Sequence, residues 1–268
     1  MKIITLIEDT RGHESCAYEH GLSIYIETQK HKLLMDAGAG NQFISNAELL
    51  GIDIASADML ILSHGHYDHA GGILDFARIN PGAPIYMQKE AAGNYYHKER
   101  YIGIDKAILN LPQVQMREGD KKIDDELYIF SDIRGRRYWA KSNYELKEKA
   151  GSEYVQDEFR HEQCLVITQG DKHILLSGCA HNGILNILDR YREIFGGWPQ
   201  SVISGFHMNK KSEYTKEEAE VIIQTARELK ELDTVFYTGH CTGQAAYEMM
   251  KPVMGDKLQQ LHTGIAVI

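Results

Sequence analysis

"LSHGHYDHAGG", residues Leu62 to Gly72, places three histidines and one aspartate within six positions. The mostly apolar run 58–62 that leads into it predicts a buried strand ending in a loop. Side chains two positions apart share one face of an extended chain, so His64 and His66 can converge on one point. The aspartate and the third histidine follow where the chain turns before two glycines. Because imidazole and carboxylate are ligands that borderline divalent metals prefer, the stretch predicts a metal site.

Length and composition bound the class of protein. The 268 residues, 43% of them apolar, suffice for one large domain or two small ones. The net charge of −9 argues against a broad nucleic-acid-binding surface, which would need an excess of lysine and arginine. "RGRR", at Arg134 to Arg137, remains a candidate basic patch that could contact an anionic substrate, although such charge runs are usually solvated.

Apolar runs and cysteines indicate the compartment. No apolar run approaches the roughly 20 residues that a membrane-spanning helix needs. The first residues, "MKIITLIEDTRG", have too short an apolar segment for a secretory signal and predict a strand. Cys16, Cys164, Cys179 and Cys241 show no paired framework, which indicates a reduced, cytoplasmic protein. No Pro-, Gly- or Ser-rich linker and no repeat divides the chain, so we expect a single domain over 1–268.

The hydrophobic pattern divides the chain into two similar halves of strands and helices. In the first half it predicts strands at 2–9, 22–28, 31–38, 58–62 and 83–87, and helices at 41–51, 72–79 and 88–100. In the second half it predicts a hairpin at 164–178, strands at 199–206, 233–240 and 258–268, and helices at 182–195, 215–232 and 243–255. Thr215 followed by Glu218 forms a capping box at the start of one helix. This order predicts two sheets packed face to face with helices outside.

Residues from about 101 to 160 have less regular patterning. They contain one expected strand, "ELYIF" at 126–130, and a charged stretch that bears several tyrosines. Long irregular segments inside a domain are usually functional. We therefore predict a lid over the site, with a plain surface insertion as the alternative.

Three further histidines follow an apolar strand and a glycine. They are His181 in "LLSGCAHNG", His207 in "VISGFHMN" and His240 in "VFYTGHCTG". One histidine of this kind would more often be structural. Since strand ends at one edge of a sheet face a common cleft, three of them predict a shared site.

At this point the sequence resembles a known family. "SHGHYDHAGG" is similar to the His-x-His-x-Asp-His motif of the metallo-β-lactamase fold superfamily. With "EHGLSIYIE", "LLMDAG", "LSGCAHNGILN", "SGFHM" and "TGHCTG", the chain resembles the branch of dihydropterin ribofuranosyl-aminobenzene phosphate synthase-like metal-dependent hydrolases, over nearly its whole length. The resemblance implies an α/β fold, the αββα four-layer sandwich, with a dinuclear metal site in a cleft.

The resemblance also implies six ligands: His64, His66 and His181 for the first metal, and Asp68, His69 and His240 for the second. Asp36 resembles the supporting aspartate that orients a ligand imidazole. His161 precedes the hairpin, where many relatives carry their third histidine, and is a rival to His181. We prefer His181 because its Gly-Cys-Ala setting matches this branch.

Two positions depart from the usual pattern. Many relatives have a metal-bridging aspartate where this chain has Cys179. Its thiolate could bridge, or it could be a buried neutral thiol, and the second alternative is slightly favoured because buried cysteine is common. His207 is not a usual ligand and is expected to bind substrate or donate a proton to the leaving group, unless it caps a strand end. Glu8 could line the mouth of the cleft or lie on the surface, and His20 is given no role.

The predicted function is a metal-dependent hydrolase that uses a metal-activated hydroxide on a small-molecule phosphoester or ester. Asp68 would orient the hydroxide or take its proton. The expected cofactors are two divalent metal ions, zinc first, with manganese or iron as alternatives. The rivals are an iron-dependent redox enzyme of the same fold, a nucleic-acid hydrolase, which the acidic charge disfavours, and a non-catalytic metal-binding protein. The expected partner is a small-molecule substrate, with no membrane contact.

Overall fold

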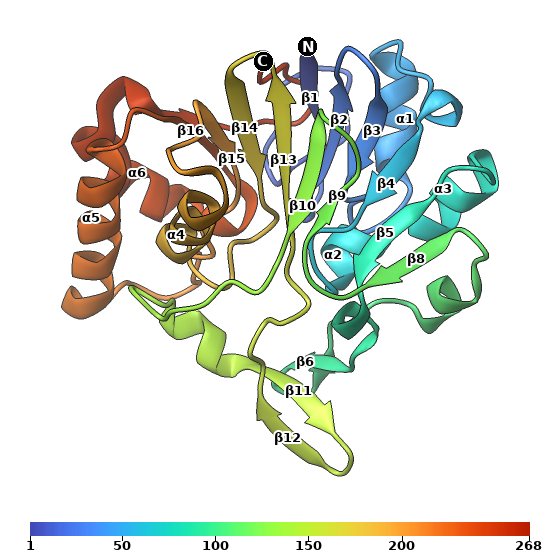
Figure 1. Cartoon of the computed structure of the whole chain (residues 1–268). Helices are drawn as coiled ribbons and strands as arrows, with labels where there is room; N and C mark the ends of the chain where they lie inside the picture. Colours follow the sequence, from blue (N-terminus) through green and yellow to red (C-terminus); the bar gives the residue numbers. More distant parts are fainter.

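Two β-sheets, each built by one half of the chain, form the centre of the computed structural model, which describes residues 1–268 (Figure 1). The first sheet has the order β1-β2-β3-β4-β5-β8. Its strands are β1 (Lys2–Ile7), β2 (Ser23–Glu27), β3 (Lys32–Met35), β4 (Met59–Ile61), β5 (Ile85–Gln88) and β8 (Val114–Arg117). The second has the order β17-β16-β15-β14-β13-β10-β9. Its strands are β9 (Lys121–Lys122), β10 (Leu127–Phe130), β13 (Cys164–Gln169), β14 (Lys172–Leu176), β15 (Ser201–Ile203), β16 (Val235–Thr238) and β17 (Leu258–Gln260).

Helices cover the outer face of each sheet, so the predicted αββα sandwich is confirmed (Figure 1). The α-helices are α1 (Gln42–Leu49), α2 (Tyr67–Ala70), α3 (Ile73–Ile79), α4 (Ile184–Phe195), α5 (Lys216–Lys230) and α6 (Gln244–Met254). Short 3-10 helices are η1 (Ile54–Ser56), η2 (Lys89–Ala92), η3 (Lys106–Asn110), η4 (Lys141–Glu145), η5 (His240–Thr242) and η6 (Gly255–Lys257). The predicted capping box is present, since the Thr215 hydroxyl accepts from the Glu218 N–H and the Glu218 carboxylate accepts from the Thr215 N–H.

Side chains that alternate between the two faces of each strand explain why the sheets and helices stack in layers. In β3, Leu34 points to the outer core with α1 and α3, whereas Leu33 and Met35 point to the core between the sheets. In β13, Leu165 faces the same inner core, and Val166 faces the core under α4, α5 and α6. Successive side chains of a strand lie on opposite faces, so both faces of each sheet are buried.

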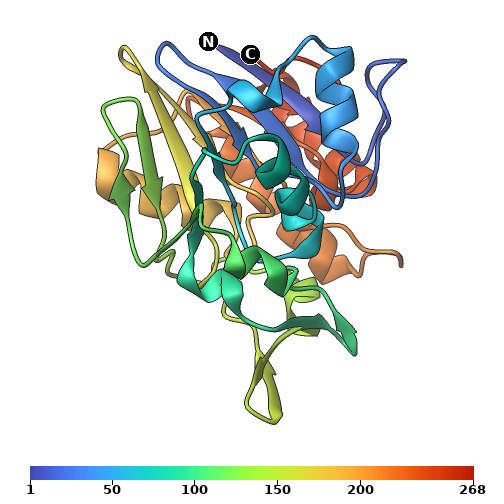
Figure 2. The same ribbon diagram turned by 90° about the vertical axis from the view of Figure 1, so that its right-hand side faces the viewer.

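A third, small sheet projects from the body of the molecule (Figure 2). It has the order β12-β11-β6-β7 and consists of β6 (Tyr95–His97), β7 (Arg100–Tyr101), β11 (Leu146–Ala150) and β12 (Glu153–Gln156). The helix predicted over 88–100 is therefore wrong beyond η2. Gly93 weakens a helix, and the tyrosines that follow favour the strand β6, which pairs with β11 some 50 residues later in the chain.

The segment 101–160 lies in several parts of the fold. It supplies β8, β9 and β10 to the two large sheets and the hairpin β11–β12 to the small one. Between them, residues 137–142 line the cavity described below. None of the helices combines the length and apolar composition that crossing a membrane requires.

Candidate metal centre

The six predicted ligands lie together at the ends of strands from both sheets. Residues 64–69 follow β4 and reach into the short helix α2, His181 follows β14, and His240 follows β16. Strands β14, β15 and β16 are parallel, so the loops after them leave at the same edge. Every one of the six residues is at most 8% exposed. The fold thus gathers residues from three separate parts of the sequence into one buried cluster.

Four of the five histidines predicted to be ligands have Nδ1 held by an oxygen atom of the protein. The pairs are His64 with Ser63 Oγ (2.8 Å), His69 with Asp36 Oδ2 (2.7 Å), His181 with Asn143 Oδ1 (3.3 Å) and His240 with Asp9 Oδ1 (2.6 Å). Such contacts fix the tautomer and the orientation of a metal-binding imidazole. Nε2 is therefore the atom that each ring has left for a ligand.

The free Nε2 atoms fit a metal ion. Nε2 of His64 lies 3.3 Å from Nε2 of His181. Two nitrogens that bind one tetrahedral zinc at about 2.05 Å are separated by about 3.3 Å. Nε2 of His66 and of His240 are buried and have no hydrogen-bond partner. Buried polar atoms are rarely unpaired, and a cation bound by each predicted set would account for these two.

Burial also favours the neutral form of the three rings predicted to bind the first metal. Burial lowers the pKa of His66 to about 3 and lowers the pKa of His64 and His181 well below the usual value. Metal ligation requires an unprotonated nitrogen, so these imidazoles need no proton removed before they bind an ion.

Asp36 links both halves of the ligand set. Its carboxylate accepts from His69 Nδ1–H, from the Ser63 hydroxyl (2.6 Å) and from the Ser63 N–H (2.6 Å). Ser63 Oγ in turn accepts from Nδ1–H of His64. The predicted contact of Asp36 with an imidazole is present, and one carboxylate orients two histidines. The backbone of Gly178 packs against this network, where a Cβ would lie 2.2 Å from Ser63 Oγ, so only glycine fits there.

Cys179 lies between the two predicted ligand sets. Its Sγ lies within 4.8 Å of the ligand nitrogens of His64 and His181, and within the same distance of those of His69 and His240. The distance from Sγ to Nε2 of His69 is 3.2 Å. The side chain is 3% exposed, and burial raises the pKa of the Cys179 thiol. A bound cation would reverse that effect and favour the thiolate.

Asp68 lies among three imidazoles. Its Oδ2 is 3.4 Å from Nε2 of His240, 3.9 Å from Nε2 of His69 and 3.3 Å from Nε2 of His20. Although burial alone would raise it, these imidazoles hold the pKa of Asp68 well below its usual range. Asp68 is therefore ionised, as a ligand carboxylate must be.

Sequence reasoning gave no role to His20 and Asp9 in this second set, and it left the place of Glu8 open. His20 Nδ1 lies 2.9 Å from Asp9, which also holds His240, and hydrogen bonds to Asp68 and Asp9 raise the pKa of His20 to about 9. Glu8 is 1% exposed and accepts from the His240 N–H, so it lies beneath the site rather than at the surface. The sequence signal for His20 was its place in "EHGLS", and no local pattern marked Asp9.

His161 lies beside the cluster but has both ring nitrogens occupied. Nδ1 accepts from the Gly65 N–H (3.0 Å), and Nε2 donates to Asp157 (3.1 Å). His66, Asp157 and His161 do lie close enough to hold an ion. The hydrogen bonds nevertheless give His161 a supporting position under the loop, whereas His181 turns a free nitrogen toward His64. This arrangement favours His181 as the third histidine.

His207 faces the cavity next to the cluster. Its ring centroid lies 4.1 Å from that of His181, and both of its ring nitrogens are buried without a partner. Its backbone has φ of 51°, and its N–H donates to Sγ of Cys241 (3.3 Å). His207 is therefore fixed at the backbone while its ring keeps both nitrogens available.

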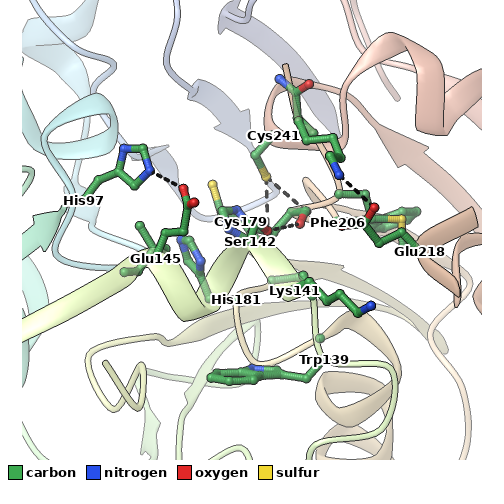
Figure 3. Close-up of a pocket in the computed structure, with 18 of the residues that line it drawn as sticks. His97, Trp139, Lys141, Ser142, Glu145, Cys179, His181, Phe206, Glu218 and Cys241 are labelled. Atoms are coloured by element: carbon green, nitrogen blue, oxygen red, sulfur yellow. Dashed lines mark hydrogen bonds and ion pairs between the residues drawn. The ribbon is translucent and has the colours of Figure 1, made fainter. Parts of the chain in front are cut away.

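The cavity has a volume of about 790 Å³, which suits a small molecule. Figure 3 shows Trp139, Glu145, Cys179 and His181 among the side chains that line it. The arginines of "RGRR" are engaged in ion pairs with carboxylates: Arg134 with Asp132, Arg136 with Glu158, and Arg137 with Asp189 and Glu228. They do not form a free basic patch.

Comparison with known proteins agrees with the fold described above. The family model described as Metallo-beta-lactamase superfamily matches residues 18–135. A 7,8-dihydropterin-6-methyl-4-(beta-D-ribofuranosyl)-aminobenzene-5'-phosphate synthase of Methanocaldococcus jannaschii is 29% identical, with 98% of this chain and 95% of the relative covered. The crystal structure of a metal-dependent hydrolase of the beta-lactamase superfamily superposes with a TM-score of 0.85 and 29% identity, covering 100% of this chain and 98% of the other. An isothiocyanate hydrolase from Delia radicum gut bacteria, 17% identical, shares the fold with a TM-score of 0.56 over 100% of this chain and 99% of its own.

Proposed function

We propose that this chain is a metal-dependent hydrolase of the metallo-beta-lactamase superfamily, whose family model matches residues 18–135, and that it acts on a small-molecule phosphoester or ester. The observation that carries this proposal is the convergence of the ring nitrogens of four histidines, two from each predicted set, around Cys179, which lines the cavity. Structural zinc sites have all positions filled by protein ligands, whereas catalytic sites keep one position open, and the cavity beside this cluster would let a substrate reach such a position.

The residues that would hold the ions divide into two sets: His64, His66 and His181 for one, and Asp68, His69 and His240 for the other. The thiolate of Cys179 would contact both. When bound, such ions supply an activated hydroxide near neutral pH and stabilise the negative charge that develops on the scissile group. Imidazole, carboxylate and thiolate together suit zinc first, with iron or manganese as alternatives.

Two side chains would handle protons. Asp68 is ionised at the centre of the second set and would orient the attacking water or accept its proton. His207 has a ring nitrogen available at the cavity and would donate a proton to the leaving group. We also propose a reducing compartment, the cytoplasm, because all four cysteines are free and buried.

The test is turnover of bis(4-nitrophenyl) phosphate, 4-nitrophenyl acetate and an alkyl acetate by protein that has been stripped with a chelator and then reloaded with zinc. We expect kcat/KM to fall by about a thousandfold on chelation and to recover with zinc, because the attacking hydroxide depends on the metal. His207→Gln should slow the alkyl ester by about a hundredfold, since that leaving group needs a proton, and should spare the 4-nitrophenyl ester.

Two results would contradict the proposal. Turnover that survives complete removal of the metal would show that the centre does not supply the nucleophile. Fully metallated protein that hydrolyses no substrate would instead favour the iron-dependent redox enzyme or the non-catalytic metal-binding protein. It would also favour a bond-forming reaction like that named for the Methanocaldococcus relative.

A further inference from the structure

Cationic side chains gather around the cavity, although the chain as a whole has a net charge of −9. The lining includes Lys98, Arg100, Arg137, Lys141, Lys210 and Lys211. Four of these six form ion pairs with carboxylates of the chain. Arg100 and Lys211 have no such partner. Their positive charge is not neutralised by a carboxylate of the chain, so they can bind an anionic ligand.

Arg100 is held beside the metal centre by two kinds of contact. Its guanidinium carbon lies 4.7 Å from the centroid of the Tyr67 ring, and Tyr67 lies between His66 and Asp68 in the sequence. The backbone is tied to the same turn, since the Tyr67 N–H donates to the carbonyl of Ile102 (2.9 Å). His66 itself forms a β-bridge with Gly103. The strand that carries Arg100 is thereby fixed to the turn that carries the ligands.

A guanidinium that stacks on an aromatic ring keeps its N–H donors free at its edge. Those donors match the two oxygens of a carboxylate or phosphate, and hydrogen bonds between charged groups are about twice as strong as neutral ones. Lys211 has no comparable contact that fixes its position in the segment after His207. Arg100 is therefore the better-placed anion-binding group.

From this geometry we infer that Arg100 binds an anionic group of the substrate that is separate from the group reacting at the metal centre. The substrate class would be a small molecule that carries an ester or phosphoester together with a second negative group, a carboxylate or a phosphate. This inference rests on the proposed function, because it places the reacting group at the proposed metal ions. It assigns a specificity-determining role to a residue that no local sequence pattern marked.

The experiment is titration calorimetry of zinc-loaded protein with dicarboxylates from malonate to adipate, each compared with the monocarboxylate of the same carbon number. One carboxylate can occupy the metal centre while the second reaches Arg100. We expect at least one dicarboxylate to bind about tenfold more tightly than its monocarboxylate, as a hydrogen-bonded charge pair would give. A parallel series of ω-phosphonocarboxylates tells whether Arg100 prefers phosphate to carboxylate.

Substitutions at Arg100 test whether this residue causes the preference for a dicarboxylate. Arg100→Ala should abolish the preference for the second charge, and Arg100→Lys should keep part of it. Arg78→Ala is the matched control, because Arg78 is an exposed arginine of α3 that pairs with Asp75 and does not line the cavity. Metal content is measured for each variant, so that a lost ion is not mistaken for a lost anion site.

The inference is overturned if no dicarboxylate binds more tightly than its monocarboxylate. It is also overturned if the preference persists in Arg100→Ala, or if Lys211→Ala removes it instead. Failure of the proposed function would be seen separately, as missing metal or as missing turnover of the 4-nitrophenyl substrates.

Discussion

Replacing His181 by alanine is expected to lower kcat/KM by about a thousandfold and to reduce the metal content, whereas replacing His161 leaves the metal bound. A thousandfold loss corresponds to about 4 kcal/mol of barrier, which is what loss of an activated hydroxide would cost. His181 turns a free Nε2 toward His64 at 3.3 Å, while both nitrogens of His161 are used within the protein. Alanine at His64, His66 or Asp68 should abolish turnover in the same way.

Comparing His181→Ala with His161→Ala distinguishes a residue that binds the metal from a residue that only stabilises the surrounding loop. His161→Ala leaves the Gly65 N–H and Asp157 without their partner, so it should lower the free energy of unfolding by about 1–3 kcal/mol. Thermal unfolding measures that effect, and elemental analysis measures the metal. Our ligand assignment is wrong if His161→Ala loses metal and His181→Ala retains it.

Cys179→Ala is expected to lose one equivalent of metal and about a hundredfold or more in kcat/KM, whereas Cys179→Asp should keep both ions. The sequence alone slightly favoured a buried, neutral thiol. The structure places Sγ within 4.8 Å of ligand nitrogens from both sets, so the side chain is buried and also central. Loss of a strong shared ligand should weaken the second ion most, and an aspartate can supply an oxygen in its place.

Cys164→Ala is the matched control, because Cys164 is also fully buried but belongs to the outer core of the second sheet. It should retain both ions. Should Cys179→Ala keep both ions and activity within about tenfold of the wild type, the thiol contributes only packing and the bridging role fails.

The parts of the site that can be predicted from the sequence are those that depend on a short local pattern. The spacing of His64, His66 and Asp68 fixes their relation on one strand end and one turn, and the glycines before His207 and His240 mark strand ends that approach closely. The two-sheet architecture follows for the same reason, because each strand and helix has its own local periodicity.

The rest of the site and of the fold depends on contacts between segments that are distant in the sequence. Asp9 contacts both His20 and His240, which are more than 200 residues apart in the sequence. The hydrophobic periodicity of a single segment cannot predict a contact between such distant residues. The small sheet pairs β6 with β11 across about 50 residues, so a tyrosine-rich run that follows alanines was predicted to be helical. The place of Cys179 between two ligand sets likewise becomes visible only after β4, β14 and β16 are aligned.

The central claim is that this cluster of histidines, carboxylate and thiol binds metal, and elemental analysis of the purified protein tests it most directly. After reconstitution with zinc and exhaustive dialysis against buffer, we predict about two equivalents of zinc per chain, since closely placed imidazole, carboxylate and thiolate ligands bind zinc tightly. Less than about a tenth of an equivalent of any transition metal under the same conditions would contradict the account.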